Sequence, residues 1–540
     1  MSADAQKTPT QQPMTSAGVR WHTSDHCPAA LTHDDAPDWF ELGGDPRAEL
    51  VKRNPLREVY RVTLSCGVFF AKVFHHRGVA ATLKRWVVGP PAVAELRTAD
   101  ALSGARVRAI RALAAGVSPS GDRSILLSEE FDGAETLAEL WEGSRPPPPG
   151  IAESLAAFLA KSHERRVLPR DVHAGNFLVR RGAAAGEWEI AYADLAGMRI
   201  ERSVTDREAA RTIAELYQWF RARSSAAQRV RFLRAYTLRR FGENHALRRQ
   251  FAHLVEEAAA AHQRRLWAKR DRRIFGTNAY FARVRPGDGW TAHLVLRCRG
   301  RDPQLMPFQG ERTLAQWRQW LARHFPDLDA EPPAALSDNI QVYRRRGGRC
   351  GSLWPKPAGS PLRRSFAVAH ALRHRDLPAL HAPALFERKS LGTVLSVLMI
   401  HQPEGTHSLS QMASRLPSDG DGDRCRLFRQ LVRAGGRLLA AMVECRVTAR
   451  DLTPDTFAVV PGADTTTPIV CIADFRGLTI HRRAVSQAVA RMPACLLRSR
   501  PGDVTRTDCL RFLLAYWRRL PHGLRRGGWK ALWRQIETVM

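Results

Sequence analysis

The chain has 540 residues, of which 44% are hydrophobic, so it is long enough for two or three domains that each bury a core. No apolar run approaches the roughly 18 residues that a membrane-spanning helix needs. The N-terminus also lacks the basic start and apolar core of a secretory signal, so we expect a cytoplasmic protein. The nine cysteines contain no C-x-x-C pair, which excludes a disulfide framework and a zinc site.

The formal net charge of +30 indicates a polyanionic partner, which could be nucleic acid, an anionic membrane leaflet or a phosphorylated glycolipid. Most of the basic residues are arginines dispersed over the whole length, however, and biased codon usage would produce the same pattern. Both interpretations stay open. No zinc finger or interleaving of basic and aromatic residues is present, which argues against nucleic acid.

The first ordered elements follow a polar N-terminus. Residues 1–35 are rich in Thr, Gln, Ser, Ala and Pro, so we expect a disordered tail. From Arg57 the letters EVYRVTL, a turn at 65–67 and VFFAKVF predict a β-hairpin. Lys72 in its second strand has apolar neighbours and needs a partner if buried. Glu95, in the helical segment PPAVAELRTADAL, is the candidate; a snorkelling edge-strand lysine with an unrelated surface glutamate is the alternative.

The next segments carry the polar residues that point to chemistry. An apolar strand ending in Glu129 and Glu130 leads through Gly133 into a helix. Downstream, LPRDVHAGNFLV (168–179) places Asp171 five positions before Asn176, and AYADLAG adds Asp194. Phosphoryl transfer from a magnesium nucleotide needs a carboxylate near the acceptor hydroxyl and oxygen ligands for the metal. These two segments supply both, although a solvated turn remains the alternative for the loop taken alone.

The second half of the chain repeats the first. Asp171 and Asp194 are 23 positions apart (194 − 171), as are Asp451 and Asp474 (474 − 451), and the two pairs are offset by 280 (451 − 171). The helical RFLRAY at 231 recurs as RFLLAY at 511 with the same offset (511 − 231). Upstream, Cys66-Gly67 followed by Lys72 recurs as Cys350-Gly351 followed by Lys356. We therefore predict two tandem domains.

The two copies differ at positions that matter for chemistry. Where the first copy has Glu95 in AVAEL, the second has His370 in AVAHA, and Thr456 replaces Asn176. Lys356 is flanked by prolines, which disfavour a central strand. We therefore expect a degenerate second site, comprising Lys356, Asp451 and Asp474, in a domain that is inactive or a weak nucleotide binder.

The loop at 168–179 resembles the kinase catalytic loop H-R-D-x-x-x-x-N, and AYADLAG resembles the D-F-G segment that follows it. Pro169 stands where kinases often have His, Leu195-Ala196 replaces Phe-Gly, and no G-x-G-x-x-G precedes Lys72. With its compact helical part and no A-P-E segment, the chain looks like the lipopolysaccharide kinase (Kdo/WaaP) family of the kinase-like superfamily. The resemblance covers about Trp39 to Arg265 well and about Asn278 to Trp533 more loosely.

The resemblance implies an α+β fold of two tandem protein-kinase-like bilobal domains, each with a small β-rich lobe and a larger helical lobe, the second being degenerate. We expect a disordered tail at 1–35, an active domain at 36–265, a basic linker at 266–277 and the second domain at 278–540.

The family's activity implies transfer of phosphate from ATP, with Mg²⁺, to a sugar hydroxyl of lipopolysaccharide core or a related glycolipid. By this resemblance Asp171 is the catalytic base, and Asn176 and Asp194 are metal ligands. Lys72, braced by Glu95, contacts phosphate, and Glu129 and Glu130 lie in the hinge that meets adenine. We expect an anionic sugar or glycolipid partner and peripheral contact with the inner membrane.

Two alternatives to this activity stay open. One is a catalytically idle tandem pseudokinase that acts as a binding or scaffold protein. The other is a kinase of a small-molecule or protein acceptor.

Overall fold

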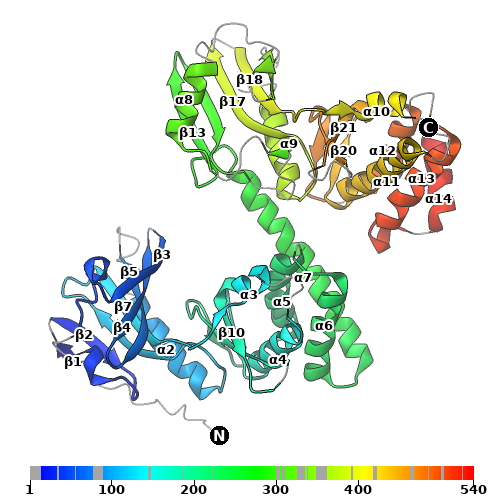
Figure 1. Cartoon of the computed structure of the whole chain (residues 1–540). Coiled ribbons are helices and arrows are strands. Elements are labelled where there is room, and N and C mark those ends of the chain that lie inside the picture. Colours follow the sequence, from blue (N-terminus) through cyan, green and yellow to red (C-terminus); the bar gives the residue numbers. More distant parts are fainter. Residues whose placement is uncertain are drawn as a thin grey trace, which may run out of the picture. The chain divides into compact units, whose positions relative to one another are not determined.

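The computed structural model divides into two compact units, residues 1–264 and 265–540. Figure 1 shows the first in blue to green and the second in green to red. The residues that the structure describes are 14–16, 18–32, 36–54, 56–76, 89–143, 148–184, 186–221, 223–298, 305–306, 311–324, 335–336, 339–347, 362–390, 393–416, 422–462, 468–483, 486–499, 504–525 and 527–540.

The first unit begins with a seven-stranded sheet in the order β1-β2-β6-β7-β5-β4-β3. Its strands are β1 (Met14–Ser16), β2 (Val19–Thr23), β3 (Ala48–Asn54), β4 (Arg57–Leu64), β5 (Gly67–His75), β6 (Ala112–Val117) and β7 (Arg123–Glu129). β4 and β5 form the predicted hairpin, with Leu64 opposite Gly67. The φ angle of Gly67 is +144°, a conformation that side chains disfavour, so glycine suits this turn. Helix α2 (Pro91–Gly104) packs against β6 and β7, and Pro91 occupies its first turn.

The predicted disorder of residues 1–35 is wrong for part of that segment. β2 pairs with β6, and a 3-10 turn (Ala29–Leu31) follows it. Trp21 and Leu31 are buried in a core that covers one face of the sheet, while the opposite face packs toward α2 and the helices. Few apolar residues in a polar segment are enough to add a strand, because the sheet supplies the backbone partners and most of the apolar surface. Residues 1–13 lie outside the described ranges.

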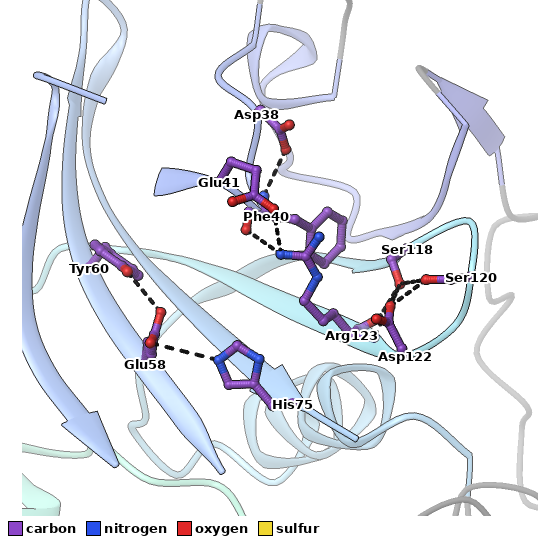
Figure 2. A network of polar contacts seen from close by, with 10 residues as sticks. All are labelled: Asp38, Phe40, Glu41, Glu58, Tyr60, His75, Ser118, Ser120, Asp122 and Arg123. Carbon is purple, nitrogen blue, oxygen red and sulfur yellow. Dashed lines mark hydrogen bonds and ion pairs between the residues drawn. The ribbon is translucent and has the colours of Figure 1, made fainter. Parts of the chain in front are cut away.

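A polar network holds the segment before β3 against the sheet, as Figure 2 shows. Arg123 of β7 donates through Nη1 to the carbonyl oxygen of Phe40 at 2.6 Å and to Glu41 Oε1 at 2.9 Å. Its guanidinium also lies over the Phe40 ring, 5.3 Å from the centroid. On the hairpin, Tyr60 donates to Glu58 Oε2 at 2.8 Å. These contacts order an otherwise irregular stretch at the outer face of the sheet.

The second lobe of the first unit is mainly helical (Figure 1). Its helices are α3 (Leu137–Gly143), α4 (Ile151–Glu164), α5 (Asp206–Arg221), α6 (Ala226–Phe241) and α7 (His245–Arg272). Short strands carry the loops of interest: β8 (Glu135–Thr136), β9 (Val167–Leu168), β10 (Phe177–Arg181), β11 (Trp188–Tyr192) and β12 (Arg199–Ile200). The two lobes are joined by backbone hydrogen bonds, from Tyr192 N–H to the Arg108 oxygen at 3.2 Å and from Ile110 N–H to the Tyr192 oxygen at 2.9 Å.

The second unit has a six-stranded sheet in the order β13-β14-β17-β18-β16-β15. The sheet strands are β13 (Phe281–Gly287), β14 (Trp290–Val295), β15 (Ala335–Leu336), β16 (Ile340–Gly347), β17 (His381–Ser390) and β18 (Thr393–His401). The remaining strands are β19 (His407–Ser408), β20 (Val447–Ala449), β21 (Phe457–Val460), β22 (Ile469–Ile472) and β23 (Leu478–Ile480). The helices are α8 (Leu314–His324), α9 (Arg363–His374), α10 (Leu409–Arg415), α11 (Asp423–Glu444), α12 (Ala488–Arg498), α13 (Arg506–Arg519) and α14 (Gly528–Val539).

Both units therefore have the mixed α+β architecture that the sequence predicts, with a β-rich lobe followed by a helical one. The lobes of the second unit are joined in the same way as those of the first. Leu380 N–H donates to the Ile472 oxygen at 2.9 Å, and Ile472 N–H donates to the Pro378 oxygen at 3.0 Å. Among the helices of the described ranges, none is both long and apolar enough to cross a bilayer.

The predicted basic linker at 266–277 is wrong, because helix α7 continues through residue 272. Trp267 and Ile274 are buried in the core of the second unit. Asp271 accepts from Arg375 Nη2 at 2.9 Å and from His374 Nδ1 at 2.9 Å. The high charge of this stretch concealed its buried face, since the arginines around Trp267 and Ile274 dominate the composition.

The N-terminal strand gives a stability prediction. Trp21 is 2% exposed and packs so closely on β6 that a Cβ at Gly116 would lie 2.8 Å from its ring. We expect Trp21→Ala to lower the free energy of unfolding of the first unit by about 3 kcal/mol, measured by hydrogen exchange of β6 and β7 peptides in urea. Met14→Ala, at a residue 41% exposed, is the control that should change little. Equal effects of the two variants would mean that the segment does not pack on the sheet.

Candidate active site

The centre of the first unit is a buried lysine between two carboxylates. Lys72 Nζ on β5 donates to Glu95 on α2 at 2.9 and 3.0 Å and to Asp194 Oδ1 at 2.9 Å. The side chain of Lys72 is 11% exposed and that of Glu95 is 4% exposed. Strand, helix and the loop after β11 each contribute one charged group. The structure thus brings together three of the residues that the sequence analysis singled out, from both lobes.

A fourth charge, on Arg57, completes the cluster. Its Nη1 donates to Asp194 Oδ2 at 3.1 Å, so Lys72 and Arg57 occupy the two oxygens of one carboxylate. Arg57 begins β4, directly after the turn that follows β3. Two cationic and two acidic side chains therefore balance in a site that is largely closed to water.

The electrostatics of the two carboxylates differ. Burial raises the pKa of Glu95, although Lys72 opposes this effect. Burial also acts to raise the pKa of Asp194, but Lys72 and Arg57 outweigh it and hold that pKa below its usual range. Asp194 is consequently ionised in the folded protein at neutral pH. A permanently charged carboxylate held by two cations is suited to binding a divalent metal in their place.

The loop between β9 and β10 places the other two predicted residues. Asp171 is exposed, and its main-chain oxygen accepts a hydrogen bond from Asn176 Nδ2 at 3.1 Å. Asn176 ends a 3-10 turn (Ala174–Asn176) that His173 caps by accepting from Gly175 N–H at 3.2 Å. The main-chain oxygen of Asn176 accepts from Ala193 N–H at 2.9 Å. This bond connects the loop of Asp171 and Asn176 to the residue before Asp194.

The donor set fits a hard cation such as Mg²⁺. Asn176 uses its Nδ2 to bond Asp171, which leaves the amide oxygen as its metal-ligating atom. That oxygen and the Asp194 carboxylate are the ligand types that Mg²⁺ prefers, since it takes one or two protein oxygens together with phosphate oxygens. Within the described residues no group of three or more His, Cys, Asp or Glu side chains gathers as a metal site. A carboxylate and an amide fit a metal that arrives with a nucleotide.

The predicted hinge residues Glu129 and Glu130 are engaged elsewhere. Glu129 N–H donates to the Arg111 oxygen at 3.0 Å, and Glu130 N–H donates to the Val68 oxygen at 3.2 Å. Their carboxylates pair with Arg111 at 3.1 Å and with Arg61 at 2.8 Å. These amides and carboxylates therefore stabilise the end of β7 and its neighbours. The structure does not bring the two glutamates into the Lys72 cluster.

Within the described part of the second unit, the corresponding place has few of these contacts. Asp451 is exposed, as Asp171 is, and Thr456 donates its N–H to the Thr453 oxygen at 3.0 Å. Asp474 is paired with Arg476 two residues away, at 2.8 Å, in place of a lysine from the sheet. His370 on α9 donates to or accepts from no carboxylate in the described contacts; its Nε2 lies 2.9 Å from the Ala382 oxygen. Burial lowers the pKa of His370 to about 3, so the ring is neutral.

The sheet order assigns Tyr343 to the place of Lys72. Lys72 on β5 lies opposite Leu126 of β7, six residues before Asp132-Gly133. Tyr343 on β16 lies opposite Leu398 of β18, six residues before Glu404-Gly405, the matching segment. The Tyr343 hydroxyl donates to Gln341 Oε1 of the same strand at 2.8 Å, and the charges of Arg476 and Asp474 both act on its pKa. Lys356, the lysine predicted from the Cys-Gly spacing, lies outside the described residues.

Comparison with known proteins supports the interpretation of the first unit. A family model described as the lipopolysaccharide kinase (Kdo/WaaP) family matches residues 60–236. This segment, about a third of the chain, is similar to the Kdo/WaaP family. The match contains Lys72, Glu95, Asp171, Asn176 and Asp194 and lies wholly within the first unit.

A solved structure described as "WaaP in complex with acyl carrier protein" is similar at 19% identity and a TM-score of 0.31, covering 44% of this chain and 99% of that one. No curated protein matches the chain. The similarity to the Kdo/WaaP family model concerns residues 60–236 and supports a kinase.

Sequence reasoning missed Arg57 and Tyr343. Arg57 lies 137 positions from Asp194, and no motif marks it; the available signal is its place after the turn where many kinases have a glycine-rich loop. Tyr343 was concealed by a short repeat of Cys, Gly and Lys that pointed to Lys356. Only strand order identifies the residue in the place of Lys72.

The buried ion pair gives a prediction with a defined pH dependence. Lys72→Met leaves Glu95 buried without its cation, so we expect a loss of about 3 kcal/mol in the free energy of unfolding. Without Lys72 the pKa of Glu95 rises further above its unfolded value. The loss should therefore be largest near pH 8 and should shrink toward about pH 5, where the folded state takes up a proton. Urea denaturation at both pH values measures it.

The matched control for this variant is Lys72→Met combined with Glu95→Leu. The double variant removes both charges, so it should recover most of the lost stability and show little pH dependence. If the single and double variants were equally unstable at both pH values, the pair would not be the source of the loss.

Proposed function

We propose that the first unit is an ATP-dependent phosphotransferase that phosphorylates a sugar hydroxyl of lipopolysaccharide core or a related glycolipid. The observation that carries the proposal is the cluster of Lys72, Glu95 and Asp194 beside the loop of Asp171 and Asn176. Each group has a task in phosphoryl transfer, and the similarity of residues 60–236 to the Kdo/WaaP family supports the class of acceptor.

The residues divide the work between donor and acceptor. Lys72, held by Glu95, neutralises charge on the phosphates of ATP. Asp194 and the amide oxygen of Asn176 would hold Mg²⁺, which when bound offsets the charge that develops on the transferred phosphoryl group. Asp171, exposed at the start of the loop, orients the acceptor hydroxyl and takes its proton as the new phosphate ester forms and ADP leaves. We propose contact with the inner face of the membrane, where a glycolipid acceptor would be presented.

The second unit is proposed to be a pseudokinase that arose by tandem duplication. Tyr343 and His370 replace the lysine and glutamate, and Asp474 is already neutralised by Arg476.

Two alternatives to the proposed glycolipid kinase activity predict different results. A scaffold in which both units are idle predicts no ATP turnover, and a kinase of a small-molecule or protein acceptor predicts turnover without glycolipid.

The duplication supplies matched controls for a test of catalysis. We expect Asp171→Ala and Asp194→Ala to lower magnesium-dependent ATP turnover by at least about 100-fold, because they remove proton acceptance and metal binding. Asp451→Ala and Asp474→Ala, their counterparts in the second unit, should change it less than about threefold. Turnover is measured on the full chain with and without lipopolysaccharide core.

Each result of this comparison distinguishes between the possible active units or between the possible acceptors. A reversed ranking of the two pairs would move the active site to the second unit. Turnover that a small hydroxyl-bearing molecule sustains in place of glycolipid would favour a small-molecule acceptor, and labelled seryl or threonyl residues would indicate a protein kinase. No turnover in wild type under any condition would favour the idle scaffold.

Arg57 gives a separate prediction about the nucleotide. In the ligand-free protein it neutralises Asp194, so metal binding has to displace it. Arg57→Gln should therefore tighten binding of Mn²⁺, a probe for Mg²⁺, in the absence of nucleotide. It should also weaken ATP binding about tenfold, because the freed guanidinium is positioned to bind phosphate oxygens. Titration of both ligands measures this.

The control is Arg61→Gln, four residues along the same strand, which removes an equal charge that pairs with Glu130 instead. Its metal affinity should match wild type. If both variants shifted the two affinities equally, general loss of positive charge would account for the result.

A further inference from the structure

We propose that the second unit binds a phosphorylated monosaccharide, or the phosphorylated sugar end of a larger molecule, in a cavity beside Asp451. The cavity measures about 520 Å³, within the range of small-molecule sites. Its lining comes from α9, from β20 and the loop after it, from the segment containing β23, and from α12. The proposal concerns binding alone and does not depend on whether the first unit transfers phosphate.

The charges around this cavity favour an anion. Arg364 of α9, Arg450 after β20 and Arg491 of α12 all line it, and Asp451 is the one carboxylate among its lining residues. All three arginines are exposed, so their guanidinium groups are accessible to a ligand. Guanidinium groups match phosphate oxygens through paired, charge-assisted hydrogen bonds. Three of them from separate elements form a site that a single dianionic phosphate can bridge.

The side chain of Arg364 and the main chain of Arg450 are held in place before any ligand binds. Arg364 Nη2 donates to Thr479 Oγ1 at 2.6 Å and to the Leu478 oxygen at 3.2 Å. The main chain of Arg450 donates its N–H to the Gly477 oxygen at 3.2 Å. Strands β20 and β23 form the floor, with Thr448 directly opposite Thr479. A preorganised site loses less conformational entropy on binding, so it holds its ligand more tightly than mobile surface arginines would.

The uncharged lining suits a sugar. Thr448, Thr479, His481 and Gln487 offer hydroxyl, imidazole and amide groups, which both donate and accept hydrogen bonds. Thr448 Oγ1 and His481 Nε2 lie 2.7 Å apart, so these two already share a hydrogen bond. Ala449, Ala488 and Met492 add a small apolar wall against which the C–H face of a sugar ring can pack. This mixture distinguishes a sugar phosphate from a bare phosphate ion.

The polar lining belongs to the second unit and not to both copies. At the positions 280 residues earlier, the first unit has Leu168, Arg199 and Glu201 in place of Thr448, Thr479 and His481. Glu201 would oppose an anion, whereas His481 does not. The second unit thus combines a degraded nucleotide side, where Tyr343 and His370 replace the charged pair, with a basic cavity on the side of Asp451. Binding without transfer is the activity that this combination supports.

The test uses the full chain and glucose 6-phosphate as the probe, without ATP. Calorimetric titration gives the affinity, and hydrogen exchange locates the site. We expect glucose 6-phosphate to bind, to protect peptides covering β20, β23 and α12, and to bind more tightly than either inorganic phosphate or glucose. Arg491→Gln and Arg364→Gln should each weaken binding about tenfold. Arg433→Gln, an exposed arginine on α11 away from the cavity lining, should leave it unchanged.

Several outcomes would overturn the proposal. These are no protection of the three elements at millimolar glucose 6-phosphate, equal affinity for glucose, or equal loss in Arg433→Gln and Arg491→Gln. Tighter binding of inorganic phosphate than of glucose 6-phosphate would exclude the sugar and leave an anion site alone. Because the measurement needs no turnover, an inactive first unit with intact binding would overturn the proposed kinase activity and leave this inference standing.

Discussion

The architecture of the first unit depends on the cost of burying the charge of Lys72. An isolated ammonium group cannot be taken out of water without partners, and the structure supplies them from α2 and from the loop after β11. Glu95 fixes the helix against the sheet, while Asp194 connects the sheet to the helical lobe. Arg57 then balances the second carboxylate. The relative position of the two lobes is thereby coupled to four charges, and a ligand that takes over Asp194 necessarily disturbs the contacts between the lobes.

The second unit has a neutral ring where the first unit has the carboxylate of Glu95. The ring of His370 takes the helix position and packs edge-on against Phe366, Phe281 and His381, with ring centroids 4.5, 5.0 and 5.3 Å away. Neutral aromatic packing carries no penalty for burying ions, so it can stabilise the contact of helix and sheet without a metal or a nucleotide. The backbone bonds between the lobes, at Leu380 and Ile472, are retained. Aromatic packing in the second unit thus occupies the place that the Lys72–Glu95 ion pair has in the first.

Local motifs predicted which polar side chains of the first unit lie close together, because short loops fix their positions. The spacing of Asp171, Asn176 and Asp194 is set by one turn and one hairpin, and both are visible as sequence patterns. Long-range pairing is not visible in this way, and Arg57 was missed for that reason. The same limit explains Lys356: a three-residue repeat suggested an equivalence that only the neighbours of β16 in the sheet can decide. The strand containing Trp21 was missed because its partner, β6, lies about ninety residues later.

The large positive charge has to be interpreted residue by residue. Many arginines serve the fold: Arg375 stacks on Trp267 with its guanidinium 4.9 Å from the ring centroid, and Arg180 stacks on Phe131 at 4.3 Å. Such residues contribute to the net charge of +30 without marking a partner surface, so the total cannot distinguish codon bias from function. Placement can. Where Arg364, Arg450 and Arg491 meet around a cavity with a single carboxylate, the positive charge is concentrated, and an anionic ligand would balance it.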